Sequence, residues 1–251
     1  MHKVIFTILL IFSKFTSTYH ICYNARQQKE KGRRDIMFFR EQEEFRKVID
    51  RCVEEEFLRG VCDKYHYLPE DREQMRQTAL VMQGIIEKEA FFQHALKEGE
   101  KLFDSVVISL GEGIDRLQDA YSEKGELTSA YMVEILAGEL LLIAYTAYNQ
   151  YMERTTDCHV ARYYFPGSEK EYPLTMISSI LSRLSTPVIC NECYCMIPKQ
   201  SVAFLALLTK DKSVRCPGIC VGCGRKDCPN SSHRERPLPY GYARILGKEF
   251  I

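Results

Sequence analysis

Residues 128–154 constrain the fold most, because they predict a long helix that is apolar on almost every side. The central run ILAGELLLIAYTAY has no polar face that would stay in water. A helix of this kind is buried in a protein core or spans a membrane. Glu139 interrupts the run and leaves the apolar stretch short of membrane length. We therefore expect a central buried helix, with Thr128 as its N-cap and Glu139 at its rim or in a functional role, the rim being favoured.

Two further helices are expected nearer the N-terminus. Residues 41–59 carry apolar side chains on one face, and Gly60 supplies a stop signal. Asp71 is placed to cap the next helix. The buried face of that helix is expected to carry Met75, Ala79, Met82 and Ile86.

A buried strand is expected at residues 105–109, followed by Gly111-Glu112-Gly113 and a helix that ends near Gly125. A Gly-x-Gly turn at a helix start is a possible phosphate site, because its exposed amides attract anions. The third glycine of the dinucleotide-binding pattern is absent, and Glu112 would repel a phosphate. The favoured interpretation is a tight turn.

Residues 159–209 predict a loop, a helix and two strands. Phe165-Pro166-Gly167-Ser168 has turn chemistry, since proline fixes one backbone angle and glycine permits a tight reversal. Pro173 suits the first turn of a helix. Its apolar stripe is expected at Leu174, Ile177, Leu181 and Leu184. Residues 188–190 predict a short strand, and residues 201–208 a longer one that is buried on both faces.

The predicted fold class is α+β, with N-terminal helices followed by a mixed or antiparallel sheet against which helices pack. We divide the chain into an N-terminal extension at residues 1–36, a helical region at 37–100, a core at 101–212 and a Cys-rich metal-binding tail at 213–251. Residues 4–12 have the size of a signal-peptide hydrophobic region but lack an Ala-x-Ala cleavage site. A buried N-terminal strand or helix, or translation from Met37, would also account for them.

Charge and cysteine content narrow the classes of partner. The 34 basic and 34 acidic residues balance, so no global field attracts nucleic acid or an anionic membrane, and small ligands or proteins are the expected partners. The odd count of 11 cysteines and their close clustering favour reduced thiols or metal ligands. We therefore expect a cytoplasmic protein.

The C-terminal cysteines predict a metal centre. Cys216, Cys220, Cys223 and Cys228 have the spacing C-x3-C-x2-C-x4-C among glycines, which lets four thiolates converge on one centre. Zinc would be structural, and an iron-sulfur cluster would carry an electron; the spacing allows both. His233 is a possible substitute ligand. A second group, Cys190, Cys193 and Cys195, is expected to consist of small buried hydrophobic residues, although Cys193 and Cys195 share a face if they lie on a strand.

The order of motifs resembles a known family. A Pro-Gly loop, a short Pro-led helix, the turn Asn191-Glu192 and the strand Ile197-Pro198-Lys199-Gln200-Ser201-Val202 look like the activation domain of cobalamin-dependent methionine synthase, particularly its stand-alone form in anaerobic bacteria. Residues 106–117, VVISLGEGIDRL, resemble a strand, glycine turn and helix start of the same family. The resemblance covers roughly residues 100–230.

The resemblance implies a ligand, a partner and a set of binding residues. The family binds S-adenosylmethionine beside a cobalamin carried on another module, through backbone groups of an Arg-x-x-Pro-Gly-Tyr loop. Here the Pro-Gly core remains, Tyr163 and Ser168 replace the arginine and tyrosine, and Arg162 lies one position early. The implied cofactor-binding residues are Arg162, Tyr163, Phe165, Gly167 and Ser168. Late in the helix predicted at residues 128–154, the family often has an acidic residue near the ligand. The corresponding residue of this chain is Tyr145, Ala147 or Tyr148.

The implied function is methionine synthesis, either by completing a split methionine synthase or by reductive remethylation of an oxidised corrinoid. The expected partners are a cobalamin-binding module or another corrinoid protein, and an electron donor. Because the protein's part is to hold the methyl donor, no catalytic residue is assigned. Two other hypotheses remain open: a non-catalytic interaction module with a decayed pocket and a zinc tail, and a small iron-sulfur electron carrier.

Overall fold

The computed structural model describes residues 36–97, 99–214 and Cys216, which belong to one compact unit, Asp35–Ile251. Within these residues the chain is α+β, with an antiparallel five-stranded sheet and six α-helices. The predicted fold class is therefore confirmed at this level. The predictions for residues 1–35 and for the tail beyond Cys216 lie outside the described residues.

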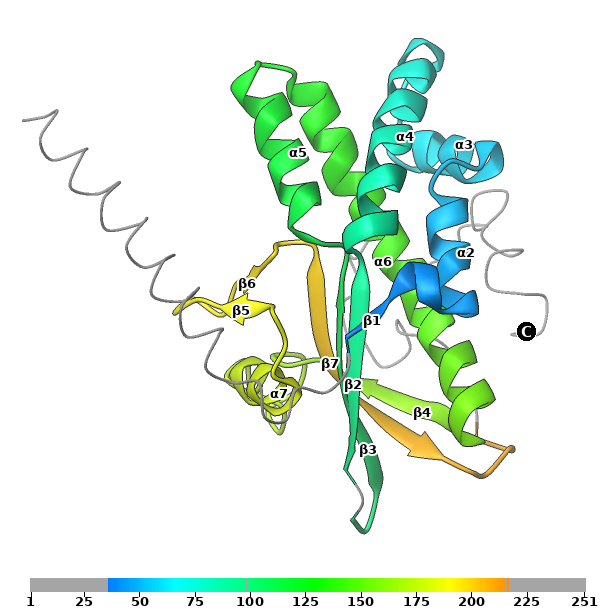
Figure 1. Ribbon diagram of the computed structural model, residues 1–251, viewed down its shortest axis with the longest axis vertical. Coiled ribbons are helices and arrows are strands. Elements are labelled where there is room, and N and C mark those ends of the chain that lie inside the picture. The colour runs from blue at the N-terminus through cyan, green and yellow to red at the C-terminus, as the bar shows by residue number, and fades with distance from the viewer. Residues whose placement is uncertain (1–35, 98, 215, 217–251) are drawn as a thin grey trace, which may run out of the picture. The chain divides into compact units, whose positions relative to one another are not determined.

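The sheet has the order β1-β2-β3-β7-β4, and every neighbouring pair is antiparallel (Figure 1). The boundary expected near residue 100 falls in the turn between β2 and β3. A separate two-stranded ribbon joins β5 and β6. The strands are β1 (Met37–Phe38), β2 (Phe91–Lys97), β3 (Leu102–Ser109), β4 (His159–Tyr164), β5 (Ile189–Cys190), β6 (Met196–Ile197) and β7 (Ser201–Thr209).

Helices cover both faces of the sheet. Helix α6 lies on one face with α2, whereas α7 and the β5–β6 ribbon lie on the other (Figure 1). Helices α4 and α5 also pack against α6. The helices are α2 (Glu43–Arg51), α3 (Glu55–Lys64), α4 (Arg72–Glu89), α5 (Glu112–Glu123), α6 (Leu127–Thr156) and α7 (Met176–Leu184), with short 3-10 turns η1 (Phe39–Glu41) and η2 (Pro69–Asp71).

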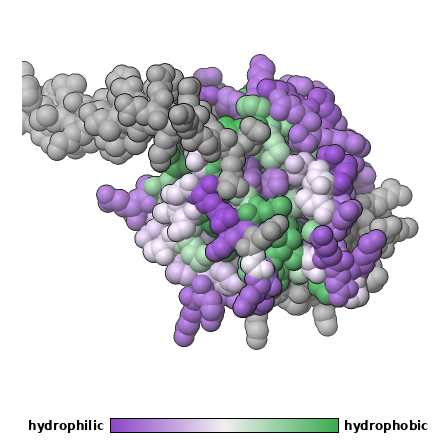
Figure 2. Space-filling model, turned by 60° about the horizontal axis from the view of Figure 1, so that its bottom comes forward, coloured by the Kyte–Doolittle hydropathy of each residue, from purple (hydrophilic) through white to green (hydrophobic). Residues whose placement is uncertain are grey.

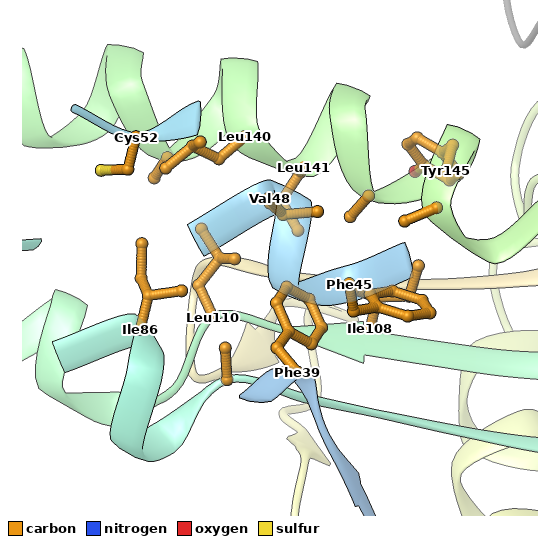
Figure 3. Packing of buried hydrophobic residues seen from close by; sticks show 14 of the residues in the cluster. Phe39, Phe45, Val48, Cys52, Ile86, Ile108, Leu110, Leu140, Leu141 and Tyr145 are labelled. Carbon is orange, nitrogen blue, oxygen red and sulfur yellow. The ribbon is translucent and has the colours of Figure 1, made fainter. Parts of the chain in front are cut away.

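The main hydrophobic core surrounds α6, as its apolar sequence requires. In Figure 3, Phe39 and Phe45 of the N-terminal segment lie between α6 and the sheet, facing Ile108. The rings of Phe45 and Phe92 stack with centroids 4.0 Å apart. Hydrophilic side chains cover most of the face drawn in Figure 2, and apolar side chains gather in a smaller patch near its middle.

Strand β7 is buried on both faces, as its continuous apolar sequence predicts. Phe204 joins the core around α6, whereas Ala203 joins a second cluster beneath α7. In that second cluster Ile177, Leu181 and Leu184 form the predicted stripe of α7, but Leu174 precedes the helix and is exposed. The predicted stripe of α4 is likewise fully buried.

Two predictions about helix ends are wrong, and a third is confirmed in position only. Residues 41–59 form two helices, because the chain becomes extended at Glu54 (ψ 129°), and α3 runs through Gly60 with buried Val61 beyond it. Thr128 lies inside α6, whose N-cap is Glu126. Asp71 is the N-cap residue of α4, as predicted, but its carboxylate makes no cap contact with that helix; it accepts the Leu68 N–H at 2.9 Å and thereby closes η2.

Helix α6 is long and apolar enough to cross a membrane, and it is the one described helix of which this is true. Of its most apolar stretch, 61% is buried within the described chain. This degree of burial is what the core helix of a folded domain shows, and it agrees with the prediction of a central buried helix.

We expect Leu140→Ala in α6 to lower the free energy of unfolding by about 2–5 kcal/mol, because Leu140 is fully buried and its loss leaves a cavity. Leu127→Ala at the exposed start of the same helix is the matched control, with an expected change within about 0.5 kcal/mol. Urea unfolding followed by circular dichroism measures both. Equal losses for the two variants would contradict the central position of α6.

Candidate functional site

The Pro-Gly loop leaves the end of β4 and leads toward α7. Phe165-Pro166-Gly167-Ser168 forms a hydrogen-bonded turn in which the Phe165 carbonyl accepts the Ser168 N–H at 3.0 Å. Gly167 has φ +85°, and proline precedes it, which is the pattern of a type II turn. The turn predicted from these four residues is therefore confirmed.

The structure separates the five predicted ligand residues into two groups. Arg162, Gly167 and Ser168 are exposed, whereas Tyr163 is buried and Phe165 packs against the main core. The Tyr163 hydroxyl donates to Asn149 Oδ1 at 2.5 Å, and burial raises the pKa of Tyr163 well above its usual value. Only the exposed group is available to a ligand at the surface.

Two backbone groups that the resemblance assigns to a ligand are already paired within the loop. The Phe165 carbonyl also accepts the Ser168 hydroxyl at 2.6 Å, and the Gly167 N–H donates to the Tyr172 carbonyl at 2.6 Å. A ligand would have to compete with these hydrogen bonds. Recognition at this loop therefore depends on its side chains more than the sequence indicates.

Three further side chains, each half-buried, complete the outer surface of the loop, and sequence reasoning missed them. The rings of Tyr164 and Tyr172 stack with centroids 4.3 Å apart, and the Arg162 guanidinium lies 4.9 Å from the Tyr164 ring centroid. Arg162 also donates to Glu169 Oε1 at 2.6 Å. We call Arg162, Tyr164, Glu169 and Tyr172 the Arg–Tyr platform. The sequence contains one signal for this pairing: a tyrosine lies on each side of the predicted Pro-Gly turn.

An aromatic cluster lies behind the loop where the family often carries an acidic residue. Tyr145 of α6 contacts the rings of Tyr163, Phe165 and Phe204 at centroid distances of 5.3–5.8 Å. Burial raises the pKa of Tyr145 above its usual range, so the hydroxyl stays protonated. The cluster provides a rigid apolar support for the loop and no charged group.

The Gly-x-Gly turn is occupied by a carboxylate of the chain itself. Glu89, the last residue of α4, accepts the Gly113 N–H at 2.6 Å and pairs with Arg116 at 2.8 Å. Gly111 has φ +96°, and a Cβ there would lie 2.4 Å from Glu89 Cβ. Since Glu89 fills the anion position at the start of α5, the tight-turn interpretation is confirmed.

Glu139 is buried rather than at the helix rim, so that prediction is wrong. Its side chain is 1% exposed, and its Oε1 accepts Lys64 Nζ at 2.6 Å and the Tyr65 hydroxyl at 2.7 Å. The pair compensates a charge that would be very unfavourable alone in the core. The pair links the end of α3 to α6, and this structural role explains the presence of a carboxylate in the core.

Among the described residues, no group of three or more His, Cys, Asp or Glu is arranged to hold a metal ion. Cys216 is buried, and its N–H donates to the Val160 carbonyl of β4 at 3.2 Å. Cys220, Cys223, Cys228 and His233 lie outside the described residues. In the second group Cys190 is half-buried, but Cys193 and Cys195 are exposed, so the expectation that they are buried hydrophobic residues is wrong.

Comparison with known proteins gives no family assignment. No protein-family model matches the chain, and no curated protein matches it significantly. The geometry of the Pro-Gly loop and the resemblance of its motifs therefore carry the functional argument.

We expect Gly111→Ala to destabilise the protein more than Gly125→Ala, although both glycines have positive φ. A positive φ costs a residue with a Cβ about 1–3 kcal/mol at either position. At Gly111 the methyl group also meets Glu89, whereas nothing lies within 4 Å of a Cβ at Gly125. Thermal and urea unfolding measure the difference; equal effects would mean that Glu89 does not fill the turn.

We also expect Asp115→Asn to flatten part of the pH dependence of stability. Asp115 of α5 accepts the Lys199 N–H at 2.8 Å, and burial raises its pKa from the usual 3.8. The folded state then binds more protons than the unfolded state above pH 3.8, so this group favours folding at low pH and loses that contribution as pH rises through its folded pKa. As pH rises through the folded pKa of Asp115, the free energy of unfolding of the variant should therefore increase relative to that of the wild type. Urea titrations at several pH values measure this difference.

Proposed function

We propose that the chain binds S-adenosylmethionine at the Arg–Tyr platform and presents it to a cobalamin carried by a partner. The role is in methionine synthesis, as part of a split methionine synthase or as its reactivator. Support comes from the motif order that resembles the methionine synthase activation domain. The observation that carries the proposal is the stacked Arg162, Tyr164 and Tyr172 beside the exposed Gly167.

The chemistry of the platform suits the three parts of the proposed ligand. Tyr172 is half-buried, and an adenine ring can stack on a tyrosine face as bases do on aromatic side chains. The guanidinium of Arg162 is a charge-assisted donor for the amino-acid carboxylate. The sulfonium is a cation, for which the Glu169 carboxylate and the tyrosine faces are suitable neighbours.

The existing contact between Arg162 and Glu169 is weak enough to be replaced by a ligand. The two side chains are 47% and 33% exposed, and exposed ion pairs contribute only about 0–1 kcal/mol. A hydrogen bond to a charged group contributes about 1.5–3 kcal/mol. A ligand carboxylate can therefore replace Glu169 as the partner of Arg162 when the rest of the ligand holds that carboxylate in place.

The protein's contribution is to position the methyl donor. The loop is attached to β4, and β4 pairs along the buried strand β7, so the platform has a rigid base. Holding the donor close to an acceptor reduces the entropy cost of reaction without a nucleophilic side chain. The partner's corrinoid supplies the methyl-accepting chemistry, and an electron donor supplies the electron that reductive methylation requires. We propose that this role is cytoplasmic, in keeping with the reduced thiols expected from the cysteine content.

The tail is proposed to bind zinc or an iron-sulfur cluster through Cys216, Cys220, Cys223 and Cys228. Cys216 pairs with Val160 in the same strand that leads to the loop. A zinc ion would stabilise this part of the chain, whereas a cluster would carry an electron.

A non-catalytic interaction module is the second candidate. The internal pairing of Gly167 N–H and the Phe165 carbonyl favours it, because two backbone contacts expected for the ligand are already made by the chain. Under this hypothesis the Pro-Gly loop is a structural turn and the platform a protein contact.

We expect S-adenosylmethionine to bind the full chain, with both Arg162→Met and Tyr172→Ala weakening binding tenfold or more. The first removes a charged hydrogen bond of about 1.5–3 kcal/mol and the second a stacking partner of about 1–3 kcal/mol, and a tenfold change requires about 1.4 kcal/mol. Calorimetry under anaerobic conditions measures the affinity. Tyr131→Ala is the matched control, because Tyr131 is an exposed tyrosine on α6.

Two results would contradict the proposal. Absence of binding up to millimolar ligand would remove the methyl-donor role and leave the interaction module. Binding that all three variants retain would place the ligand away from the Arg–Tyr platform.

A further inference from the structure

Three thiols lie within six residues at the β5–β6 ribbon, and no role described so far uses them. Cys190 ends β5, whereas Cys193 and Cys195 lie in the connection to β6. Cys190 is half-buried and packs against the cluster beneath α7; Cys193 and Cys195 are exposed. The ribbon thus presents two adjacent accessible thiols and one sheltered thiol.

The backbone of both exposed cysteines is anchored by one side chain. Asn191 Oδ1 accepts the N–H groups of Cys193 and Cys195, each at 2.9 Å. The Asn191 N–H donates to the Cys195 carbonyl at 3.0 Å, and the Asn191 carbonyl accepts the Tyr194 N–H at 3.0 Å. These contacts fix the separation of the two cysteines and close the tip of the ribbon.

The conformation of the residue between them shortens that separation. Tyr194 has φ +60°, in the left-handed region, so the chain coils at this point. Two residues in extended chain span about 6.6–7.2 Å, and a disulfide requires a Cα to Cα distance of about 4.4–6.8 Å. A coiled segment is shorter than an extended one and falls toward the middle of the disulfide range. The Cys195 sulfur also lies 3.9 Å from the Cys193 carbonyl oxygen.

Cys190 differs from the other two in environment. Burial is the main cause that raises its pKa, and its sulfur lies 3.6 Å from the Asn191 carbonyl oxygen, which accepts the thiol hydrogen. Since Cys190 is half-buried whereas Cys193 and Cys195 are exposed, Cys190 is the least accessible of the three.

We propose that Cys193 and Cys195 are a dithiol–disulfide pair that exchanges with low-molecular-weight disulfides. The thiolate of one cysteine attacks a disulfide RS–SR, forms a mixed disulfide and releases RS⁻. The thiolate of the other then attacks the protein sulfur of that mixed disulfide, closes the Cys193–Cys195 bond and releases a second RS⁻. The two cysteines are oxidised, and the external disulfide is reduced to two thiols. This site is independent of S-adenosylmethionine binding.

Tryptic mapping provides a direct test, because residues 184–199 form one tryptic peptide that contains only these three cysteines. The native full chain is incubated with oxidised glutathione, alkylated and digested. The expected peptide has one alkyl group, on Cys190, and has lost two hydrogen atoms through a Cys193–Cys195 bond. Three alkylated cysteines, or a cross-link that includes Cys190, would overturn the proposal.

Single variants resolve the two steps. Cys195→Ser should retain glutathione on Cys193, and Cys193→Ser should retain it on Cys195, because the second attack is removed in each. Buried Cys52 monitors folding, since it is alkylated only if a variant unfolds. The wild-type chain unfolded in urea is a further comparison that requires no variant. After the same incubation, a smaller fraction of the unfolded chains than of the native chains should contain the Cys193–Cys195 disulfide. An equal fraction in both states would mean that the Asn191 anchor does not preorganise the pair.

Discussion

The burial of α6 is the constraint on which the rest of the structure depends. A helix of 30 residues with apolar side chains on every side requires partners all around it. The chain supplies them as α2, α4, α5 and one face of the sheet. Because β4 follows α6 directly after Asp157, which ends the helix in a left-handed conformation, the same burial also fixes where the Pro-Gly loop begins.

Two buried carboxylates in this core are each paired, through one oxygen, with side chains distant in the sequence. Asp104 of β3 is fully buried, and its Oδ2 contacts His94 Nδ1 at 2.9 Å and the Tyr148 hydroxyl at 2.8 Å. Glu139 is held in the same manner by Lys64 and Tyr65. Removal of one member from such a group leaves a desolvated partner, which is far less favourable than exchange of the whole group for apolar residues. These contacts select one arrangement of helices around α6.

The sequence predicted the elements whose signal is local and periodic. The stripe of α4, the continuous apolar run of β7 and the glycine turn before α5 each follow from spacing within a few residues. The misplaced features depend on distant partners. The local sequence favours a rim position for Glu139, because its partner Lys64 lies 75 residues away. It also favours a stop at Gly60, because no local pattern indicates that Val61 and Cys62 beyond it are buried. The pairing of Tyr164 with Tyr172 required the geometry of the turn itself.

The Pro-Gly loop shows that a turn motif can be fully explained by the fold. A type II turn needs glycine at the third position whatever the loop binds, so Pro166-Gly167 alone does not identify a ligand. Here the turn uses the Gly167 N–H and the Phe165 carbonyl internally, while the buried Tyr163 and the inward-packed Phe165 anchor it to the core. Any ligand contact that the loop makes therefore depends on its outer surface. Arg162, Tyr164 and Tyr172 are stacked there without contributing to the core around α6, and their stacking is the feature that a purely structural turn does not require.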